Sequence, residues 1–206
     1  MDMNLFRQLP IIGILRGVKA DALEELTETV VSSGLKTIEI TMNTPGAAEL
    51  IKQMSRFSKS RVTLGAGTVL TMDALHSALD AGATFIVLPV LVEDVVGYCV
   101  KKSIPVFPGA LTPKEIYTAW AAGATMVKVF PAKYFGAGYL KEIKGPFNDI
   151  ELLACGGVSA DNIKSFFSCG ASAVAFGASI FRREWLEAGE FSRIKESIER
   201  LIAAAF

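Results

Sequence analysis

The stretch AGATMVKVFP, residues 122–131, has a close copy in AGATFIVLP at residues 81–89. Each copy contains the end of a helical pattern, a glycine, a short apolar run and a proline. Such runs of β-branched and aromatic residues favour a strand, and the proline ends it. The two copies therefore predict a unit of helix end, turn and strand that recurs along the chain. SGLKTIEI and CGASAVAFG are weaker copies of the same unit.

Eight strand candidates follow from this unit, near residues 11, 36, 62, 84, 104, 126, 151 and 173, and a helical pattern follows each. Glycines stand where the intervening helices would end in the left-handed conformation, at Gly34, Gly82, Gly123 and Gly170. Strand–helix units repeated in this way indicate a parallel sheet that is buried on both faces.

The best match to this pattern is an α/β fold of the (β/α)8 TIM-barrel type. We expect residues 1–206 to form a single domain, with 1–10 as an N-terminal segment and 190–206 as a C-terminal helix. The alternative is a doubly wound open sheet, which would place its phosphate-binding glycines after the first strand. Here the glycine clusters follow the last two strands, which favours the barrel.

The composition is that of an ordinary globular chain. It has 206 residues, 51% hydrophobic and 20% charged, with a formal net charge of zero. No block of Lys and Arg is present, so the sequence carries no electrostatic footprint for nucleic acid or an anionic membrane. No apolar run approaches a membrane span of about 20 residues, and MDMNLFRQLP does not resemble a signal peptide. We expect a cytoplasmic protein whose partner is a small molecule.

Cysteine and histidine offer little support for a metal site. The three cysteines, Cys99, Cys155 and Cys169, form no C-x-x-C pair, so reduced thiols are expected. His76 is the only histidine, in a pattern that predicts a helix surface. A single histidine argues against a metal site built on histidines.

Lys128 interrupts the apolar run within AGATMVKVFP. In a strand, Met126, Lys128 and Phe130 share one face, while Val127 and Val129 point the other way. Burial disfavours the charged form of an amine, and a buried lysine is a nucleophile suited to a carbonyl. The structural alternative is a lysine whose head group reaches solvent or pairs with a carboxylate.

Three further side chains are predicted at the carboxyl ends of the strands, where barrel active sites lie. Alternation along the second strand points Glu39 into the barrel, either as ion-pair partner of Lys128 or as a general base. Arg16 ends the first strand, where it could clamp a carboxylate or lie on the surface. Thr68 adds a hydroxyl donor at the mouth of the third strand.

Two glycine-containing loops, CGGVS and FGAS, follow the seventh and eighth strand candidates. Backbone N–H groups at Gly156, Gly157, Gly177 and Ala178, beside a helix expected to start at Ser179, could cradle a phosphate. Tight turns alone would also explain either glycine pair. Their occurrence at the two loops where barrels often hold phosphate favours phosphate binding.

The motifs IEIT, GAGTVL, PG followed by LTPKE, VKVFPA, GPF and GGVS, in this order, resemble the 2-keto-3-deoxy-6-phosphogluconate (KDPG) aldolase family. The resemblance runs from about Ile11 to Ile180. It implies a class I aldolase without metal or other cofactor, usually a homotrimer of barrels. Such an enzyme cleaves its 2-keto-3-deoxy-6-phospho sugar acid to pyruvate and glyceraldehyde 3-phosphate. By resemblance, Lys128 is the Schiff-base lysine and Glu39 the general acid/base.

The resemblance also assigns the substrate contacts. It places carboxylate binding at Thr68 and phosphate binding at Gly156, Gly157 and Ser179, and it includes Asn43, Pro89 and Gly177 among the substrate-binding positions. Departures from the family pattern occur at three of its positions. Asn43 stands where many members have an arginine, Leu88 where relatives usually have serine or threonine, and Cys155 where threonine is common.

These departures leave the substrate open. Arg16 together with Asn43 is similar to the galactonate-preferring branch of the family, in which carboxylate binding would move from the second strand to the first. A second alternative is an aldolase for 4-hydroxy-2-oxoglutarate, which carries a carboxylate in place of the phosphate. A reading of a different class is a phosphate-binding barrel that is an isomerase or a non-catalytic binder.

Overall fold

Nine short parallel strands form one sheet in the computed structural model, which describes residues 1–206. They are β1 (Ile11–Leu15), β2 (Thr37–Thr41), β3 (Thr63–Gly67), β4 (Ile86–Val87), β5 (Val106–Phe107), β6 (Gly109–Ala110), β7 (Val127–Val129), β8 (Leu152–Cys155) and β9 (Ala173–Phe176). Their order is β5-β4-β3-β2-β1-β9-β8-β7-β6. Consecutive strands are therefore neighbours, and β1 beside β9 joins the two ends of the chain.

The ring is completed by a strand that Pro108 divides into β5 and β6. β5 pairs with β4, and β6 pairs with β7. The N–H of Thr125 donates to the Val106 carbonyl at 2.9 Å, and that of Lys128 to the Pro108 carbonyl at 2.8 Å, so both pieces bond to the segment that carries β7. Proline has no N–H to donate, which accounts for the break. The predicted (β/α)8 barrel is confirmed, with eight strand segments of which the fifth is interrupted.

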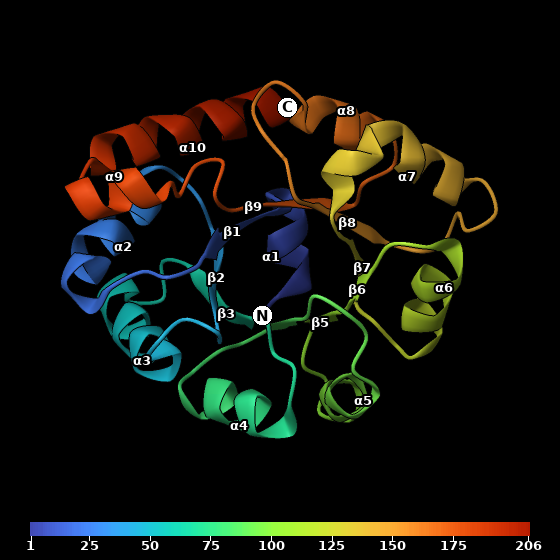
Figure 1. The fold of residues 1–206 in the computed structure, drawn as a ribbon, viewed down its shortest axis with the longest axis horizontal. Helices are drawn as coiled ribbons and strands as arrows, with labels where there is room; N and C mark the ends of the chain where they lie inside the picture. The colour runs from blue at the N-terminus through green and yellow to red at the C-terminus, as the bar shows by residue number, and fades with distance from the viewer.

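Helices surround the strands as an outer ring, while α1 lies across the middle of the ring (Figure 1). The α-helices are α1 (Met3–Gln8), α2 (Leu23–Ser32), α3 (Ala47–Ser58), α4 (Met72–Asp80), α5 (Glu93–Lys101), α6 (Pro113–Ala121), α7 (Gly136–Lys144), α8 (Ile163–Ser168), α9 (Arg183–Ala188) and α10 (Phe191–Ala205). Two 3-10 helices, η1 (Ala20–Ala22) and η2 (Ala132–Tyr134), complete the set. The four glycines predicted to end helices all have positive φ angles, between 84° and 103°.

The prediction that a helix starts at Ser179 is wrong. Residues 177–181 form one turn, in which the Phe181 N–H donates to the Gly177 carbonyl at 2.9 Å. The following helix, α9, begins only at Arg183 and has six residues. No apolar periodicity marks this helix or α1, because α9 buries no side chain and α1 buries only that of Phe6.

The barrel interior has its own apolar cluster, separate from the layer between strands and helices. It contains Phe6 of α1 together with inward-facing strand residues, namely Ile12, Phe85, Val87, Phe107, Met126, Leu153, Cys155, Ala173 and Ala175. The Phe6 and Phe107 rings lie 6.3 Å apart between centroids, and the amino terminus donates to the Thr84 carbonyl at 3.2 Å, just before β4. α1 therefore closes the barrel where the strands begin, which leaves the opposite end for polar side chains.

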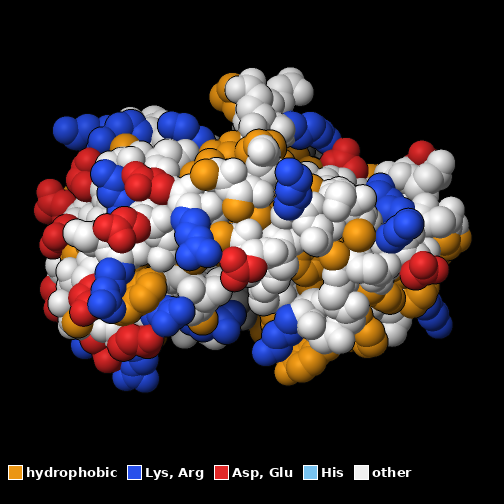
Figure 2. Space-filling view, turned by 90° about the horizontal axis from the view of Figure 1, so that it is seen from above, with side chains coloured by type: hydrophobic (Ala, Val, Ile, Leu, Met, Phe, Trp, Pro, Cys, Tyr) orange, Lys and Arg blue, Asp and Glu red, His pale blue; other side chains and the backbone are white.

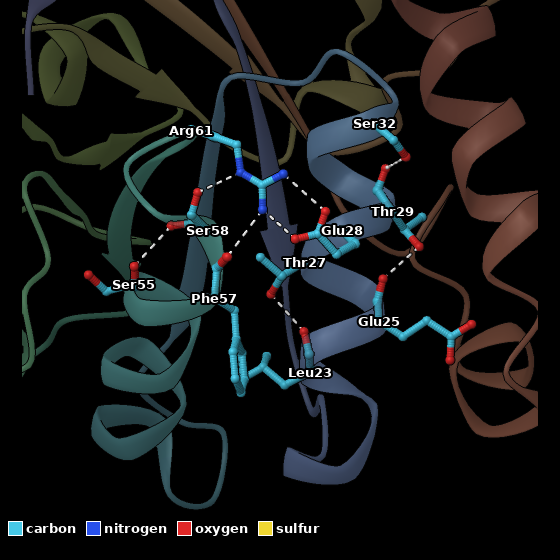
Figure 3. Close-up of polar contacts among 10 residues, drawn as sticks. All are labelled: Leu23, Glu25, Thr27, Glu28, Thr29, Ser32, Ser55, Phe57, Ser58 and Arg61. Carbon is cyan, nitrogen blue, oxygen red and sulfur yellow. Dashed lines mark hydrogen bonds and ion pairs between the residues drawn. The ribbon is translucent and has the colours of Figure 1, made fainter.

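Arg61 joins two neighbouring helices at the end of α3 (Figure 3). Its guanidinium donates to the Ser58 carbonyl at 3.0 Å, to the Phe57 carbonyl at 3.2 Å and to the Glu28 carboxylate of α2. The hydrogen bond from Arg61 lowers the pKa of Glu28. This contact precedes β3, so it supports the fold at the end of the barrel opposite to the carboxyl ends of the strands.

The outer surface carries both signs of charge. Figure 2 shows basic and acidic side chains interleaved over the face it presents, in keeping with the net charge of zero. No helix combines the length and the apolar character needed to cross a bilayer.

Candidate active site

Lys128 lies on β7 between Gly109 of β6 and Leu153 of β8, and only 6% of it is exposed. It alternates with Val127 and Val129, which belong to the outer core layer, and shares its strand face with Met126 in the interior cluster. The prediction that Lys128 points into the barrel is thus confirmed. Its Nζ lies 5.2 Å from the centre of the Phe130 ring.

Glu39 lies on β2, opposite Ile14 of β1 and Gly65 of β3, with 1% of its surface exposed. Its Oε2 atom has no hydrogen-bond partner. Burial raises the pKa of Glu39, while the charges of Lys128 and Arg16 act in the opposite direction. The seven ion pairs of the protein do not include Lys128 or Glu39. Glu39 is therefore a buried carboxyl group with an unused oxygen, in the electrostatic field of the lysine.

Gly67, at the end of β3, makes room for this carboxyl group. A Cβ atom at Gly67 would lie 2.2 Å from Oε1 of Glu39 and 2.7 Å from its Cδ. The sequence alone does not reveal this role of Gly67, because the contact joins neighbouring strands rather than neighbouring residues. The second glycine of the GAGT motif is therefore required because a side chain there would overlap the Glu39 carboxyl group.

Gly67→Ala is expected to displace the Glu39 carboxyl group and to destabilise the protein by about 1–3 kcal/mol, the usual cost of overpacking a core. Any reaction in which the Glu39 carboxyl group takes part should slow about 10- to 100-fold, since small misplacements of a reacting group have effects of that size. Turnover and urea unfolding measure the two effects. Gly97→Ala on α5 is the control, because a Cβ there meets no atom within 4 Å. Equal behaviour of the two variants would contradict the steric role.

Thr68 follows β3 directly and has a left-handed backbone with φ of 56°. Such a conformation is rare for a β-branched residue, and strain of this kind concentrates at functional sites. Thr68 is half-buried. Its position at the carboxyl end of the strand next to that of Glu39 agrees with the sequence prediction.

The mouth of the barrel also contains Arg16 and Asn43, both exposed. Arg16 follows β1 and lines a cleft of about 800 Å³, together with Ile14 and Ala178 among others. Asn43 lies in the turn after β2, in which the Thr44 N–H donates to the Thr41 carbonyl at 2.9 Å. Arg16 therefore lies between the end of the first strand and the loop after the last.

Pro89 follows β4 and is half-buried beside Gly109. A Cβ at Gly109 would lie 2.1 Å from the Pro89 carbonyl oxygen, so only glycine permits this approach of the two backbones. Gly109 is also the register partner of Lys128. Gly109 therefore contacts both the strand that carries Lys128 and the loop that carries Pro89.

The two predicted phosphate loops are joined by a hydrogen bond. Ser179 donates from Oγ to the Val158 carbonyl at 3.0 Å, which ties the loop after β9 to the loop after β8. Gly156 and Gly157 have φ angles of 96° and 79°, a conformation that glycine adopts without strain. Asn162 fixes the second glycine by donating to the Gly157 carbonyl at 2.8 Å. Because residues 177–181 form only one turn, any anion held here would rely on these loop N–H groups.

Cys155 lies at the end of β8, within the interior cluster, and is 3% exposed. Burial raises the pKa of its thiol, and the charges of Lys128, Glu39 and Arg16 all act on it. The Cys155 thiol therefore lies close enough to Lys128 and Glu39, inside the barrel, to feel their charges. The other expectations for cysteine and histidine agree with the structure, since all three cysteines are free and His76 lies exposed on α4.

With this geometry in hand, comparison with known proteins gives a consistent result. A family model described as KDPG and KHG aldolase matches residues 3–197. The chain is 31% identical to the 2-dehydro-3-deoxy-6-phosphogalactonate aldolase of Escherichia coli K12, over 85% of this chain and 86% of that protein. It is also 31% identical to the 2-dehydro-3-deoxy-phosphogluconate aldolase of Pseudomonas aeruginosa, over 94% of this chain and 89% of that protein.

Solved structures agree with these relatives. A native KDPGal structure superposes with a TM-score of 0.88 at 29% identity, covering 96% of this chain and 94% of that chain. KDPG aldolase from Legionella pneumophila superposes with a TM-score of 0.87 at 25% identity, covering 96% of both chains. That crystal structure holds pyruvate captured at low pH as a covalent carbinolamine intermediate.

Proposed function

Because this chain belongs to the KDPG and KHG aldolase family, we propose that it is a class I aldolase that acts through a Schiff base on Lys128. The proposed substrate is 2-keto-3-deoxy-6-phosphogluconate, and the products are pyruvate and glyceraldehyde 3-phosphate. One observation carries the proposal: Lys128 is buried on the interior face of β7, in the field of a buried carboxyl group with a free oxygen. A purely structural lysine would be expected to pair with that carboxylate.

The reaction begins at the C2 carbonyl of the substrate. The free amine of Lys128 attacks C2 to form a carbinolamine, which loses water to give an iminium ion. Glu39 then accepts the proton of the C4 hydroxyl, the C3–C4 bond breaks, and its electron pair passes to the iminium nitrogen as an enamine. Protonation of the enamine at C3 and hydrolysis release pyruvate and restore the amine.

The remaining side chains hold the two ends of the substrate. Arg16 and Thr68, which follow β1 and β3, would bind the C1 carboxylate, and Asn43 and Pro89 would line the mouth between them. The loops at Gly156, Gly157, Gly177 and Ser179 would hold the distal phosphate through backbone N–H groups, and the hydrogen bond from Ser179 to Val158 holds the two loops together. Holding both ends fixes the C3–C4 bond above Lys128, which contributes to rate by orientation.

Reductive trapping tests the chemistry. Incubation with pyruvate and sodium borohydride should attach a reduced pyruvate adduct to Lys128, detected by mass spectrometry and peptide mapping. An isomerase or a non-catalytic phosphate binder would form no imine and would remain unmodified. An unmodified protein, or an adduct confined to another lysine such as Lys133, would contradict the proposed mechanism.

The galactonate epimer is a second candidate substrate, and two observations favour it. Asn43 provides no charge at the mouth where Arg16 does, and two relatives with 31% and 32% identity are named as an aldolase and a probable aldolase of 2-dehydro-3-deoxy-6-phosphogalactonate. Both epimers give the same cleavage products, so the condensation direction distinguishes them. Pyruvate and D-glyceraldehyde 3-phosphate form a new centre at C4, whose configuration is measured by NMR. Faster condensation with glyoxylate would instead indicate 4-hydroxy-2-oxoglutarate.

A further inference from the structure

Two threonine hydroxyls form a buried polar contact at the end of β2. Thr41 and Thr44 are 1% and 3% exposed, and their Oγ1 atoms lie 3.1 Å apart. Thr44 Oγ1 also accepts a hydrogen bond from the Gly17 N–H at 3.0 Å. The contact therefore connects the turn after β2 to the segment that follows β1.

That segment, residues 16–19, forms a single hydrogen bond that involves a side chain, the one from Gly17 to Thr44. At its far end, Lys19 is the N-cap residue of η1. Residues 17–19 line two clefts, of about 800 and 420 Å³, so the segment borders open space. Gly17 has a φ angle of 67°, and a Cβ there would meet nothing within 4 Å. Only Val18, which is 4% exposed, anchors the segment by burial.

Arg16 lies next to this link in the chain. It immediately precedes Gly17, its side chain is exposed, and it forms no ion pair within the chain. Its backbone is held between the end of β1 and the Gly17–Thr44 hydrogen bond. An arginine that must bind an anion from an exposed loop loses affinity when the loop has to be ordered first.

The link also reaches the strand that carries Glu39. Thr41 shares the interior side of β2 with Glu39, two residues away, and the two threonines enclose the turn that contains Asn43. The hydroxyl pair therefore connects the segment that contains Arg16 to the strand that holds the carboxyl group.

We propose that Thr44 is a positioning residue, which acts through Arg16 by holding residues 16–19 over the mouth of the barrel in the geometry that binds the substrate carboxylate. The proposal rests on the proposed function. Thr44 itself touches no reacting atom. Loss of its hydroxyl leaves the Gly17 N–H without its partner and frees the loop, so substrate binding weakens while the chemistry at Lys128 is retained.

The test compares Thr44→Val with Thr44→Ser in the full chain. Thr44→Val, which has nearly the same shape without the hydroxyl, should raise KM for the phospho sugar acid about tenfold and leave kcat within about twofold. Thr44→Ser should restore KM to within about threefold of the wild type, because it keeps the acceptor. A parallel fall in kcat, or a KM that serine does not rescue, overturns the proposal.

A double-mutant cycle with Arg16→Met separates positioning from general destabilisation. If Thr44 acts through Arg16, Thr44→Val adds almost nothing to KM once the guanidinium is absent. An undiminished effect in that background overturns the proposal. Thr27→Val is the matched control, since Thr27 on α2 is a buried threonine whose hydroxyl donates to the Leu23 carbonyl at 2.6 Å (Figure 3). Its KM should equal that of the wild type.

Borohydride trapping with pyruvate distinguishes failure of the proposed function from failure of the role of Thr44 alone. A wild-type protein without an adduct on Lys128 contradicts the proposed function and, with it, the role of Thr44. A normal adduct on Lys128, combined with an unchanged KM in Thr44→Val, overturns the role of Thr44 alone.

Discussion

Lys128→Arg is expected to lose nearly all turnover while the barrel remains folded. A guanidinium keeps the positive charge but cannot form an imine with a ketone, so the electron sink disappears. We expect kcat to fall about 10⁴-fold or more, the scale seen when a covalent nucleophile is removed. The larger head group should cost about 1–3 kcal/mol of stability through overpacking, because only 6% of Lys128 is exposed. A coupled assay of pyruvate release and a thermal melt measure the two quantities.

Lys133→Arg is the matched control for this variant. Lys133 lies in η2, exposed, with its Nζ 4.9 Å from the centre of the Tyr134 ring. It should retain turnover, and it should still form the borohydride adduct on Lys128. Lys128→Arg should form no adduct at all. Turnover close to that of the wild type in Lys128→Arg would end the Schiff-base proposal, whatever the adduct map showed.

Most of the barrel can be predicted from the sequence because each strand and helix is marked by a local pattern that recurs along the chain. The copy of AGATMVKVFP at 81–89 and the helix-ending glycines define a unit that needs no partner to be recognised. Pro108 could not be read in this way, since its effect is to divide a strand whose two halves bond to different neighbours. The sequence does not reveal the helices α1 and α9, because α9 buries no side chain and α1 buries only that of Phe6.

In the candidate site, too, local features can be predicted from the sequence and contacts between distant residues cannot. Alternation on two strands was sufficient to place Lys128 and Glu39 inside the barrel, because side-chain direction in a strand follows from sequence position alone. The space for the Glu39 carboxyl group depends on Gly67 of the next strand. The loop of Arg16 is hydrogen-bonded through Gly17 to Thr44, 27 residues beyond Gly17. Contacts of this kind exist only once the strands are side by side, so a single sequence does not contain them in readable form.

Glu39→Gln is expected to reduce kcat about 10²- to 10⁴-fold, the usual contribution of a positioned general base. Glutamine has nearly the same shape, but its amide cannot accept the C4 hydroxyl proton. Lys128 should still form the borohydride adduct with pyruvate, because imine formation uses the amine. In the wild type, burial raises the pKa of Glu39. The acidic limb of kcat/KM should therefore lie above the ordinary carboxyl value of 4.5, and it should disappear in the variant.

The same variant should be more stable than the wild type at alkaline pH, and the sign follows from proton linkage. Burial raises the pKa of Glu39 in the folded state, so folding favours the protonated carboxyl group. The stability that this group contributes is present at low pH and is lost as the pH rises through the folded pKa. Glutamine has no such loss, because it never ionises. Opposing attraction from Lys128 reduces the effect, but burial is the larger influence.

Urea unfolding of Glu39→Gln and wild type at several pH values measures this difference. The advantage of the variant should be clear at pH 8 and should vanish as the pH falls below 4.5, the ordinary value for glutamate, where both folded and unfolded carboxyl groups are protonated. Glu24→Gln on α2, an exposed position, controls for the change in net charge. A variant that is less stable than the wild type at pH 8 would mean that the attraction to Lys128 outweighs burial. Glu39 would then be the structural ion-pair partner of the lysine, and its part in proton transfer would need another residue.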